Sequence, residues 1–128
     1  METKISIRGH RPPAGVAPSK TAVWRDAVGR AAYEYCGKIN CLSGCGIDLE
    51  FFVLRPKNHI DRDGIRPEAP VLPLSKPDIT KAVTVTIWAL MRAIGCPERW
   101  CAAMTARKSW VCSADLQGVD ITIRTENL

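Results

Sequence analysis

Six cysteines are the residues whose chemistry can be examined from spacing alone. They form two local groups and one isolated position: Cys36, Cys41 and Cys45, then Cys96 and Cys101, then Cys112. No Cys-x-x-Cys pair occurs, which is the spacing that many zinc sites and redox motifs use. The first group is still a candidate metal site. The alternative, which the spacing favours, is that the cysteines serve as small buried apolar side chains.

Cationic side chains mark a second candidate region, the long segment 57–75. Its proline content and lack of periodicity predict an exposed loop, longer than compact domains usually carry without a function. Cations in and beside it outnumber Asp61, Asp63 and Glu68; they are Arg55, Lys57, Arg62, Arg66 and Lys76. They could clamp a phosphate backbone, or they could be the charges of an ordinary solvated loop. His59 is a further candidate phosphate contact, although exposed histidines without a function are commoner.

The composition is that of a single globular domain covering residues 1–128. Apolar residues make up 46% and charged residues 24%, so a core can form. Lys and Arg number 18 against 13 Asp and Glu, and the net charge of +5 modestly favours an anionic partner such as nucleic acid. The longest apolar stretch, 82–94, is interrupted by polar residues, which argues against a membrane span. Because no run of signal-peptide length opens the sequence, we expect a cytoplasmic protein.

Four strands are expected from alternating or apolar runs. They are residues 4–8, 47–54, 101–111 and 119–124, with a turn at 115–118 before the last strand. Trp100 and Trp110, ten residues apart, are expected on one face of the same strand. Core packing is the ordinary role of such a pair, and base stacking is the alternative.

Two helices are expected between these strands. Apolar residues at helical spacing predict the first from Thr21 to a cap at Gly37, after a proline-rich arm, 9–19, that is expected to be non-helical. Residues 75–78 resemble a capping box with Pro77 in the first turn of a second helix, whose apolar face runs from Ile79 to Ile94 and which Gly95 ends. The order β-loop-α-β-loop-α-β-β predicts an α/β fold with a mixed sheet of about four strands and two main helices.

Segments along nearly the whole chain resemble the RusA-like Holliday junction resolvases of bacteriophage and prophage genomes. A strand and a Gly- and Pro-containing arm at 5–13 come first, followed by a Trp-Arg-Asp-Ala-Val helix at 24–28. Arg-Pro-Lys-Asn-His at 55–59 is similar to the sequence that leads into the family's basic loop. Lys-Pro-Asp at 76–78, Lys-Ser-Trp at 108–110 and the strand 119–123 follow in the family's order.

The resemblance implies a homodimer that cuts four-way DNA junctions with Mg²⁺ bound by several carboxylates. Asp78 and Glu98 match the family's metal-binding and catalytic positions, so any Mg²⁺ is expected to bind to these two carboxylates. Each also has a structural interpretation, Asp78 as a helix cap and Glu98 as an exposed acid after a helix. The expected DNA contacts are Arg55, Lys57, Arg62, Arg66, Lys76, Lys81 and Lys108.

Two catalytic positions of the resemblance are replaced in this sequence. Thr80 stands where the family has a second Asp, and Thr84 stands at a basic position; Trp88 replaces a third acidic residue. A hydroxyl lacks the charge of a carboxylate, so Mg²⁺ affinity is expected to fall by about 10-fold or more. The departures predict a protein whose nuclease activity is impaired.

Three functions follow as hypotheses. The first is a DNA-binding RusA-like protein of phage recombination or replication with little or no catalysis. The second is an active Mg²⁺- or Mn²⁺-dependent junction nuclease in which Asp61, Asp63 or a partner subunit supplies the missing ligand. The third is a phage protein repurposed to bind a host or phage recombination protein through an exposed patch near Trp88.

Overall fold

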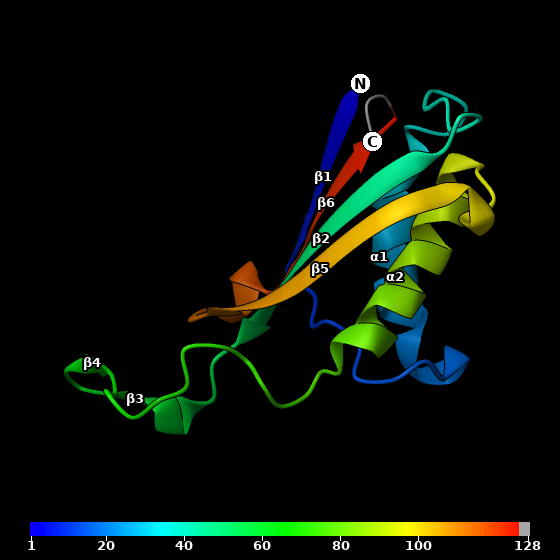
Figure 1. The fold of residues 1–128 in the computed structure, drawn as a ribbon. Coiled ribbons are helices and arrows are strands. Elements are labelled where there is room, and N and C mark those ends of the chain that lie inside the picture. Colours follow the sequence, from blue (N-terminus) through cyan, green and yellow to red (C-terminus); the bar gives the residue numbers. More distant parts are fainter. Residues whose placement is uncertain (126–128) are drawn as a thin grey trace.

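Four strands form one mixed sheet in the order β1-β6-β2-β5 (Figure 1). They are β1 (Glu2–Arg8), β2 (Cys45–Leu54), β5 (Cys101–Val111) and β6 (Gly118–Arg124). The computed structural model describes residues 1–125. Strand β6 pairs antiparallel with both β1 and β2, and β5 pairs parallel with β2. The predicted α/β fold with a mixed sheet is therefore confirmed.

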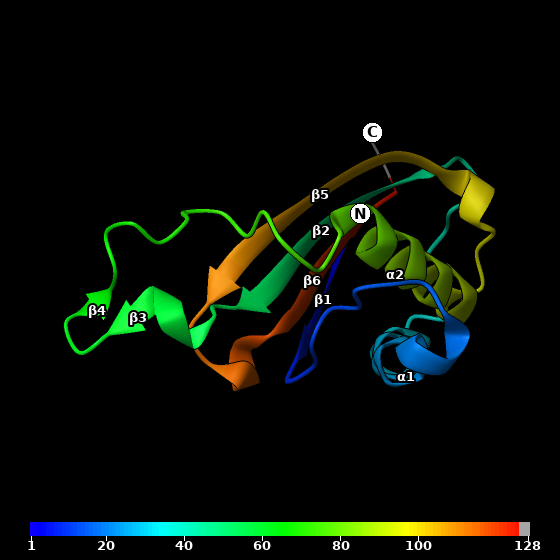
Figure 2. The ribbon, with the colours of Figure 1, turned by 90° about the horizontal axis from the view of Figure 1, so that it is seen from below.

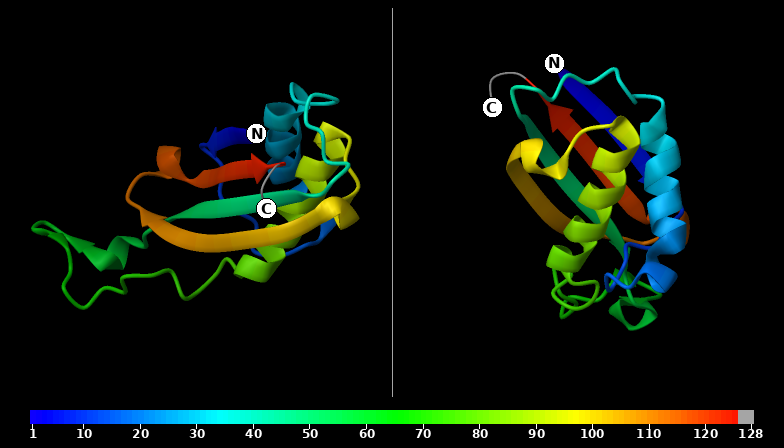
Figure 3. Two further views of the ribbon diagram at one scale, coloured as in Figure 1. Left: turned by 45° about the horizontal axis from the view of Figure 1, so that its top comes forward. Right: turned by 90° about the vertical axis from the view of Figure 1, so that its right-hand side faces the viewer.

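Two helices cover one face of this sheet, α1 (Pro18–Tyr33) and α2 (Ile79–Ile94) (Figure 2 and Figure 3). Helix α2 connects β2 to β5 and supplies the crossover that a parallel pair requires. Asp78 caps its N-terminus and Gly95, with a positive φ of 80°, ends it. Within residues 1–125, no helix is long and apolar enough to cross a membrane.

The core lies between the sheet and the helices. On β2, Phe51 and the other odd-numbered residues are buried under the helices, as the alternation predicts. Trp24 of α1 packs on Phe51 with 6.2 Å between ring centroids, and its indole N–H donates to the buried Thr86 hydroxyl at 2.9 Å. Thr86 donates in turn to the Ala82 carbonyl at 2.7 Å, so this buried polar pair is satisfied and links α1 to α2.

The first helix begins and ends earlier than the sequence predicts. It starts at Pro18, inside the segment expected to be non-helical, because proline fits the first turn of a helix. It ends at Tyr33, and Gly37, the predicted cap, adopts its positive φ of 73° in the turns that follow. The periodicity thus located the helix correctly, whereas its ends depend on local backbone geometry.

Two predictions about the second helix and the tryptophans are wrong. Ser75 does not cap α2, because the Asp78 carboxylate accepts the Thr80 N–H. Trp100 lies in a short 3₁₀ turn, η2 (Glu98–Trp100), before β5, so it does not share a strand face with Trp110. The turn expected before the last strand is present as η3 (Ala114–Leu116).

Residues 57–77 form an arm that projects beyond the end of the sheet (Figure 1). After η1 (Lys57–His59), the strands β3 (Ile60–Asp61) and β4 (Gly64–Ile65) make a small hairpin, and the chain then returns without regular structure. The Pro70 carbonyl holds the returning chain, since it accepts hydrogen bonds from Arg55 at 3.0 Å and from the Trp110 indole at 3.1 Å. The predicted loop is therefore present, with a hairpin that its sequence pattern did not predict.

Candidate nucleic-acid interface

Lys108 positions the segment that leads into α2. From β5 its ammonium group donates to the Ser75 carbonyl at 2.8 Å and to the Pro77 carbonyl at 2.9 Å. Two of its three protons are thereby used within the chain. Lys108, expected as a DNA contact, thus has a structural role and retains one proton for a phosphate.

The Asp78 carboxylate is engaged in capping α2. Its Oδ1 accepts the Thr80 N–H at 2.9 Å and the Thr80 hydroxyl at 2.6 Å. These hydrogen bonds, the hydroxyl's first, lower the pKa of Asp78. Thr84 donates its hydroxyl to the Thr80 carbonyl at 2.9 Å, one turn back along the helix. Both threonines therefore bind groups of their own helix, and neither supplies a charge.

Glu98 does not lie near Asp78, which corrects the expectation of a shared site. Asp78 precedes the first residue of α2, whereas Glu98 lies in η2, beyond the C-terminal end of that helix. A helix of 16 residues is about 24 Å long. Ligands of one Mg²⁺ lie within about 2.1 Å of the ion, so the two carboxylates of one chain do not bind the same ion.

Among residues 1–125, no other acid completes the site. Asp61 and Asp63 lie in the hairpin of the arm, where the Asp61 carboxylate accepts the Asp63 N–H at 2.8 Å. Among residues 1–125, no three or more His, Cys, Asp or Glu side chains are placed as ligands of one metal ion. The residues that the resemblance assigns to Mg²⁺ therefore do not fit a site for this ion in a single chain.

A capping role for Asp78 predicts how its variants behave. Because Asn caps helices as well as Asp does, Asp78→Asn is expected to keep the melting temperature of the wild type, whereas Asp78→Ala lowers it. Millimolar Mg²⁺ is expected to leave all three melting temperatures unchanged. Thermal unfolding followed by circular dichroism measures this. A rise on adding Mg²⁺ that Asp78→Asn abolishes would contradict the capping role.

The cations expected to contact DNA fall into two sets. The first set lies on the segments that lead into and out of the arm and on the first turn of α2; it comprises Arg55, Lys57, Lys76, Lys81 and Lys108, and we call it the root cluster. Hydrogen bonds tie Arg55 to the Pro70 carbonyl and Lys108 to the Ser75 and Pro77 carbonyls. Asp78 is the one acid in the segments 55–59, 75–81 and 108–110 that carry it. The N-terminal end of α2 adds the positive end of its dipole.

The second set lies at the tip of the arm and carries no net positive charge. Arg62 and Arg66 are both exposed there, among Asp61, Asp63 and Glu68. Arg66 also lies 3.9 Å from the Glu68 carboxylate. The excess of positive charge thus lies on the segments at the two ends of the arm and at the start of α2, and not at the tip of the arm.

The face of the sheet opposite the helices carries three carboxylates that the sequence analysis did not single out. Asp48 and Glu50 alternate along β2, and Glu50 is the register partner of Asp120 on β6. Each is paired with an arginine: Asp48 with Arg124, Glu50 with Arg107 at 3.0 Å, and Asp120 with Arg8 at 2.8 Å. The alternation of residues along β2 predicts that Asp48 and Glu50 lie on one face of the sheet. Which arginine pairs with each carboxylate depends on the register of the neighbouring strands.

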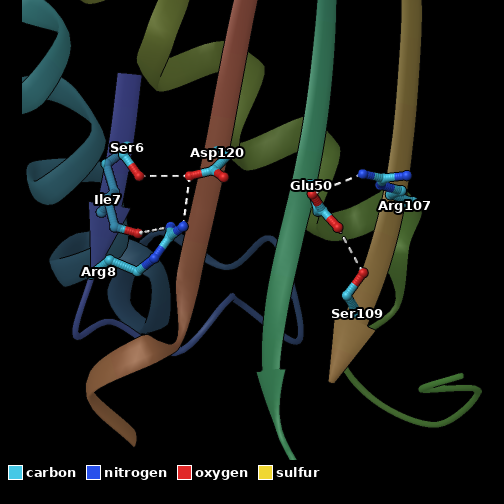
Figure 4. Close-up of polar contacts among 7 residues, drawn as sticks. All are labelled: Ser6, Ile7, Arg8, Glu50, Arg107, Ser109 and Asp120. Atoms are coloured by element: carbon cyan, nitrogen blue, oxygen red, sulfur yellow. Dashed lines mark hydrogen bonds and ion pairs between the residues drawn. The ribbon is translucent and has the colours of Figure 1, made fainter. Parts of the chain in front are cut away.

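Hydroxyl groups complete the contacts of this open face (Figure 4). Ser6 donates to Asp120 at 2.6 Å, and Ser109 donates to Glu50 at 2.8 Å. Since each carboxylate has a cationic partner, the face carries little net charge. It offers neither the free carboxylates that a divalent cation needs nor the excess of cations that DNA phosphates attract.

The pair of Asp48 and Arg124 predicts a loss of stability in acid. Hydrogen bonds from Arg124, and then from Thr105, lower the pKa of Asp48 below its ordinary value. A depressed pKa in the folded state stabilises the protein above the unfolded pKa of about 3.9, and this stabilisation is lost as the pH falls through the folded value. Urea unfolding between pH 6 and pH 2 is expected to show a smaller acid-induced loss in Asp48→Asn. An identical pH dependence would contradict this role.

The cysteines divide between buried and exposed positions. Cys41, Cys45 and Cys96 are buried, as small apolar side chains are expected to be, whereas Cys36 and Cys112 are exposed. Burial raises the pKa of Cys96 to about 12. The first local group, Cys36 with Cys41 and Cys45, is thus split between the surface and the core.

Comparison with known proteins adds no relative from which a function can be transferred. No protein-family model matches the chain, and no curated protein matches it significantly. The functional argument therefore rests on the geometry of the chain and on the resemblance of its motifs.

Proposed function

We propose that this chain is a RusA-like protein that binds branched or duplex DNA through the root cluster and does not cut it. The proposal joins the order of the motifs to the chemistry around the start of α2. In such a protein the fold and the cationic surface are retained, while the carboxylates that bind a catalytic ion are reduced to one helix cap.

The charge imbalance at the root cluster is the observation that carries the proposal. Five cations lie on segments that carry one acid, Asp78, and this acid is used as a cap. Lys57, Lys76 and Lys81 are exposed, and their ammonium groups form no hydrogen bond or ion pair with the described residues. Free ammonium groups of this kind bind backbone phosphates, a contact that positions a protein on DNA without reading its sequence.

A homodimer, which the motif resemblance implies, would present two root clusters to one DNA molecule. A four-way junction offers several duplex arms at once. When one root cluster of the dimer binds one arm, the second cluster is held at a high effective concentration near another arm, so the dimer binds a junction more tightly than a single duplex end. Bound in this way, the protein would block other junction-processing enzymes or hold recombination proteins at the junction.

A gel-shift experiment with a synthetic four-way junction and a duplex of matched length tests the proposal. Binding is expected at about 50 mM salt, and about four phosphate contacts by each chain predict a loss of affinity on the order of 100-fold for each bound chain at about 200 mM. Incubation with Mg²⁺ or Mn²⁺ is expected to leave the labelled strands intact. Absence of binding at low salt would refute the proposal. Symmetric nicks that Asp78→Asn abolishes would instead establish the active nuclease.

A groove between α1 and α2 favours protein binding as a second candidate function. It encloses about 790 Å³, and its lining includes Arg25, Arg92 and Trp88. Trp88 is 39% exposed, and the Arg25 guanidinium lies 5.4 Å from its ring centroid. A recombination protein of host or phage that is captured at high salt by the wild type and lost in Trp88→Ala would support this function over DNA binding.

A further inference from the structure

The groove between α1 and α2 opens on the side of the helices that faces away from the sheet. Its lining residues are exposed or half-buried, whereas the helix residues that pack on the sheet are buried. The two helices lie side by side (Figure 3), and the hydrogen bond from the Trp24 indole to Thr86 joins them on their buried side. On α1 the lining extends from Ala22 to Tyr33, about 16 Å of helix or three turns. The groove is therefore long enough for another helix to lie in it.

Small residues leave the floor of this groove unfilled. A Cβ added at Gly29 has no contact within 4 Å with a described residue other than its neighbours in the helix, so the space beside this glycine is open. The rings of Trp88 and Tyr33 also line the groove, and both side chains are exposed. Apolar surface of this kind, in contact with water in the free chain, is what the apolar side chains of a partner bury. The other small residues of the lining are Ala22, Ala89 and Ala93.

Three arginines and one aspartate border the groove, which gives its lining an excess of positive charge. The Arg30 guanidinium is paired with Asp26 at 2.9 Å, and the Arg25 guanidinium lies over the Trp88 ring, 5.4 Å from its centroid. Arg92 is exposed, and its guanidinium forms no hydrogen bond or ion pair with a described residue. Arg92 is thus the cation of the groove that is available to an anionic group of a ligand.

The partners of these arginines favour a protein ligand over a nucleic acid. Phosphate backbones bind where several cations are available, whereas two of the three arginines here are already engaged within the chain. An amphipathic helix presents both features that complement the groove: an apolar stripe for the open floor, and polar positions beside the stripe that reach the rims. Because the rims carry an excess of positive charge, carboxylates at those positions are the complementary groups.

We propose that the groove between α1 and α2 binds an amphipathic helix of a partner protein whose apolar stripe is flanked by acidic residues. The apolar side chains occupy the space beside Gly29 and cover the Trp88 ring, and a carboxylate beside the stripe forms an ion pair with Arg92. This inference rests on the second candidate function, protein binding at the groove, and it specifies the chemistry of the partner. It does not depend on DNA binding by the root cluster.

A set of three synthetic helical peptides, each of about four turns, tests this chemistry. The peptides share one stripe of leucines and differ only in the residues that flank it, which are glutamate, glutamine or lysine. Fluorescence anisotropy at about 0.15 M salt measures their binding to the full-length protein. The glutamate peptide is expected to bind about 10-fold more tightly than the glutamine peptide, and the lysine peptide more weakly than either.

Variants of the groove separate the contribution of its charge from that of its shape. Arg92→Gln is expected to weaken the glutamate peptide by about 10-fold and to leave the glutamine peptide unchanged. Gly29→Leu keeps every charge but fills the floor, and Trp88→Ala removes the apolar wall, so each is expected to weaken both peptides by about 10-fold or more. Lys20→Gln makes the same change of charge on α1 outside the lining and is expected to bind as the wild type does. Thermal unfolding shows that each variant is folded.

Four outcomes would overturn the proposal. If no peptide binds the folded wild type, the groove is not a helix-binding site, a result that leaves junction binding by the root cluster unaffected. If the glutamine or lysine peptide binds most tightly, the partner is not acidic, although protein binding at the groove is retained. If Lys20→Gln weakens the glutamate peptide as much as Arg92→Gln does, the attraction is one of net charge alone. If Arg92→Gln instead weakens binding of a four-way junction, the groove is a nucleic-acid surface.

Discussion

Replacing Gly118 with alanine is expected to lower the free energy of unfolding by several kcal/mol. Gly118 begins β6 with a φ of 153°, and it is paired with Arg8 on β1 and with Phe52 on β2. A Cβ built at this position lies 1.8 Å from the Ile7 carbonyl oxygen and 2.8 Å from the Ile7 carbonyl carbon. Both obstructing atoms belong to the backbone of a paired strand, so no side-chain rotation relieves the overlap.

The size of this effect follows from ordinary overpacking. Added carbon atoms in a packed interior cost about 1–3 kcal/mol, and a φ of 153° adds about 1–3 kcal/mol for a residue with a Cβ. Together they amount to about 2–6 kcal/mol, a large fraction of the total stability of a small domain, which is about 5–15 kcal/mol. Urea unfolding is the measurement. Gly29→Ala, in α1, where nothing lies within 4 Å of the added Cβ, is the control and is expected to stabilise by about 0.5–1 kcal/mol. Equal stability of the two variants would contradict the argument.

The sequence pattern was sufficient for the elements and insufficient for their ends. Strand β2 was predictable because apolar and polar residues alternate along it. Helix α2 was predictable because its apolar residues recur at helical spacing and a glycine follows its last turn. The start of α1 at Pro18 was not, because a proline that breaks a helix interior also fits a helix start. The β-branched residues 83–87, which by themselves favour a strand, are helical because they lie inside α2.

The candidate site shows a similar division. The cations near the start of α2 were identifiable, since they occur in a recognisable order of motifs. The separation of Asp78 from Glu98 follows from the full length of α2, whereas the motif spacing aligned them as one site. The pairing of Cys45 with Cys101 depends on the parallel register of β2 and β5. Long-range pairing of this kind has no local signal in one sequence.

Because the positive charge lies at the root cluster and not at the arm tip, removing the lysines of the root cluster is expected to cause a large loss of DNA affinity. Substituting Lys57, Lys76 and Lys81 together with glutamine removes three exposed ammonium groups, of which only that of Lys81 interacts with a described acid, Asp78. If each binds one phosphate, the slope of the logarithm of affinity against the logarithm of salt becomes shallower by about 2.7. At about 0.1 M salt, junction affinity is expected to fall on the order of 100-fold.

A matched control carries the same change of net charge on another surface. Lys38, Arg92 and Arg99 are exposed toward the C-terminal end of α2, away from its first turn, and their triple glutamine variant is expected to lose little affinity and to keep the salt slope of the wild type. The pair Arg62→Gln and Arg66→Gln is also expected to have a small effect, because acids surround both residues at the arm tip. Fluorescence anisotropy with a labelled four-way junction measures all three. If the control triple variant loses as much affinity as the root-cluster variant, the attraction is one of net charge alone, and the root cluster is not the binding surface.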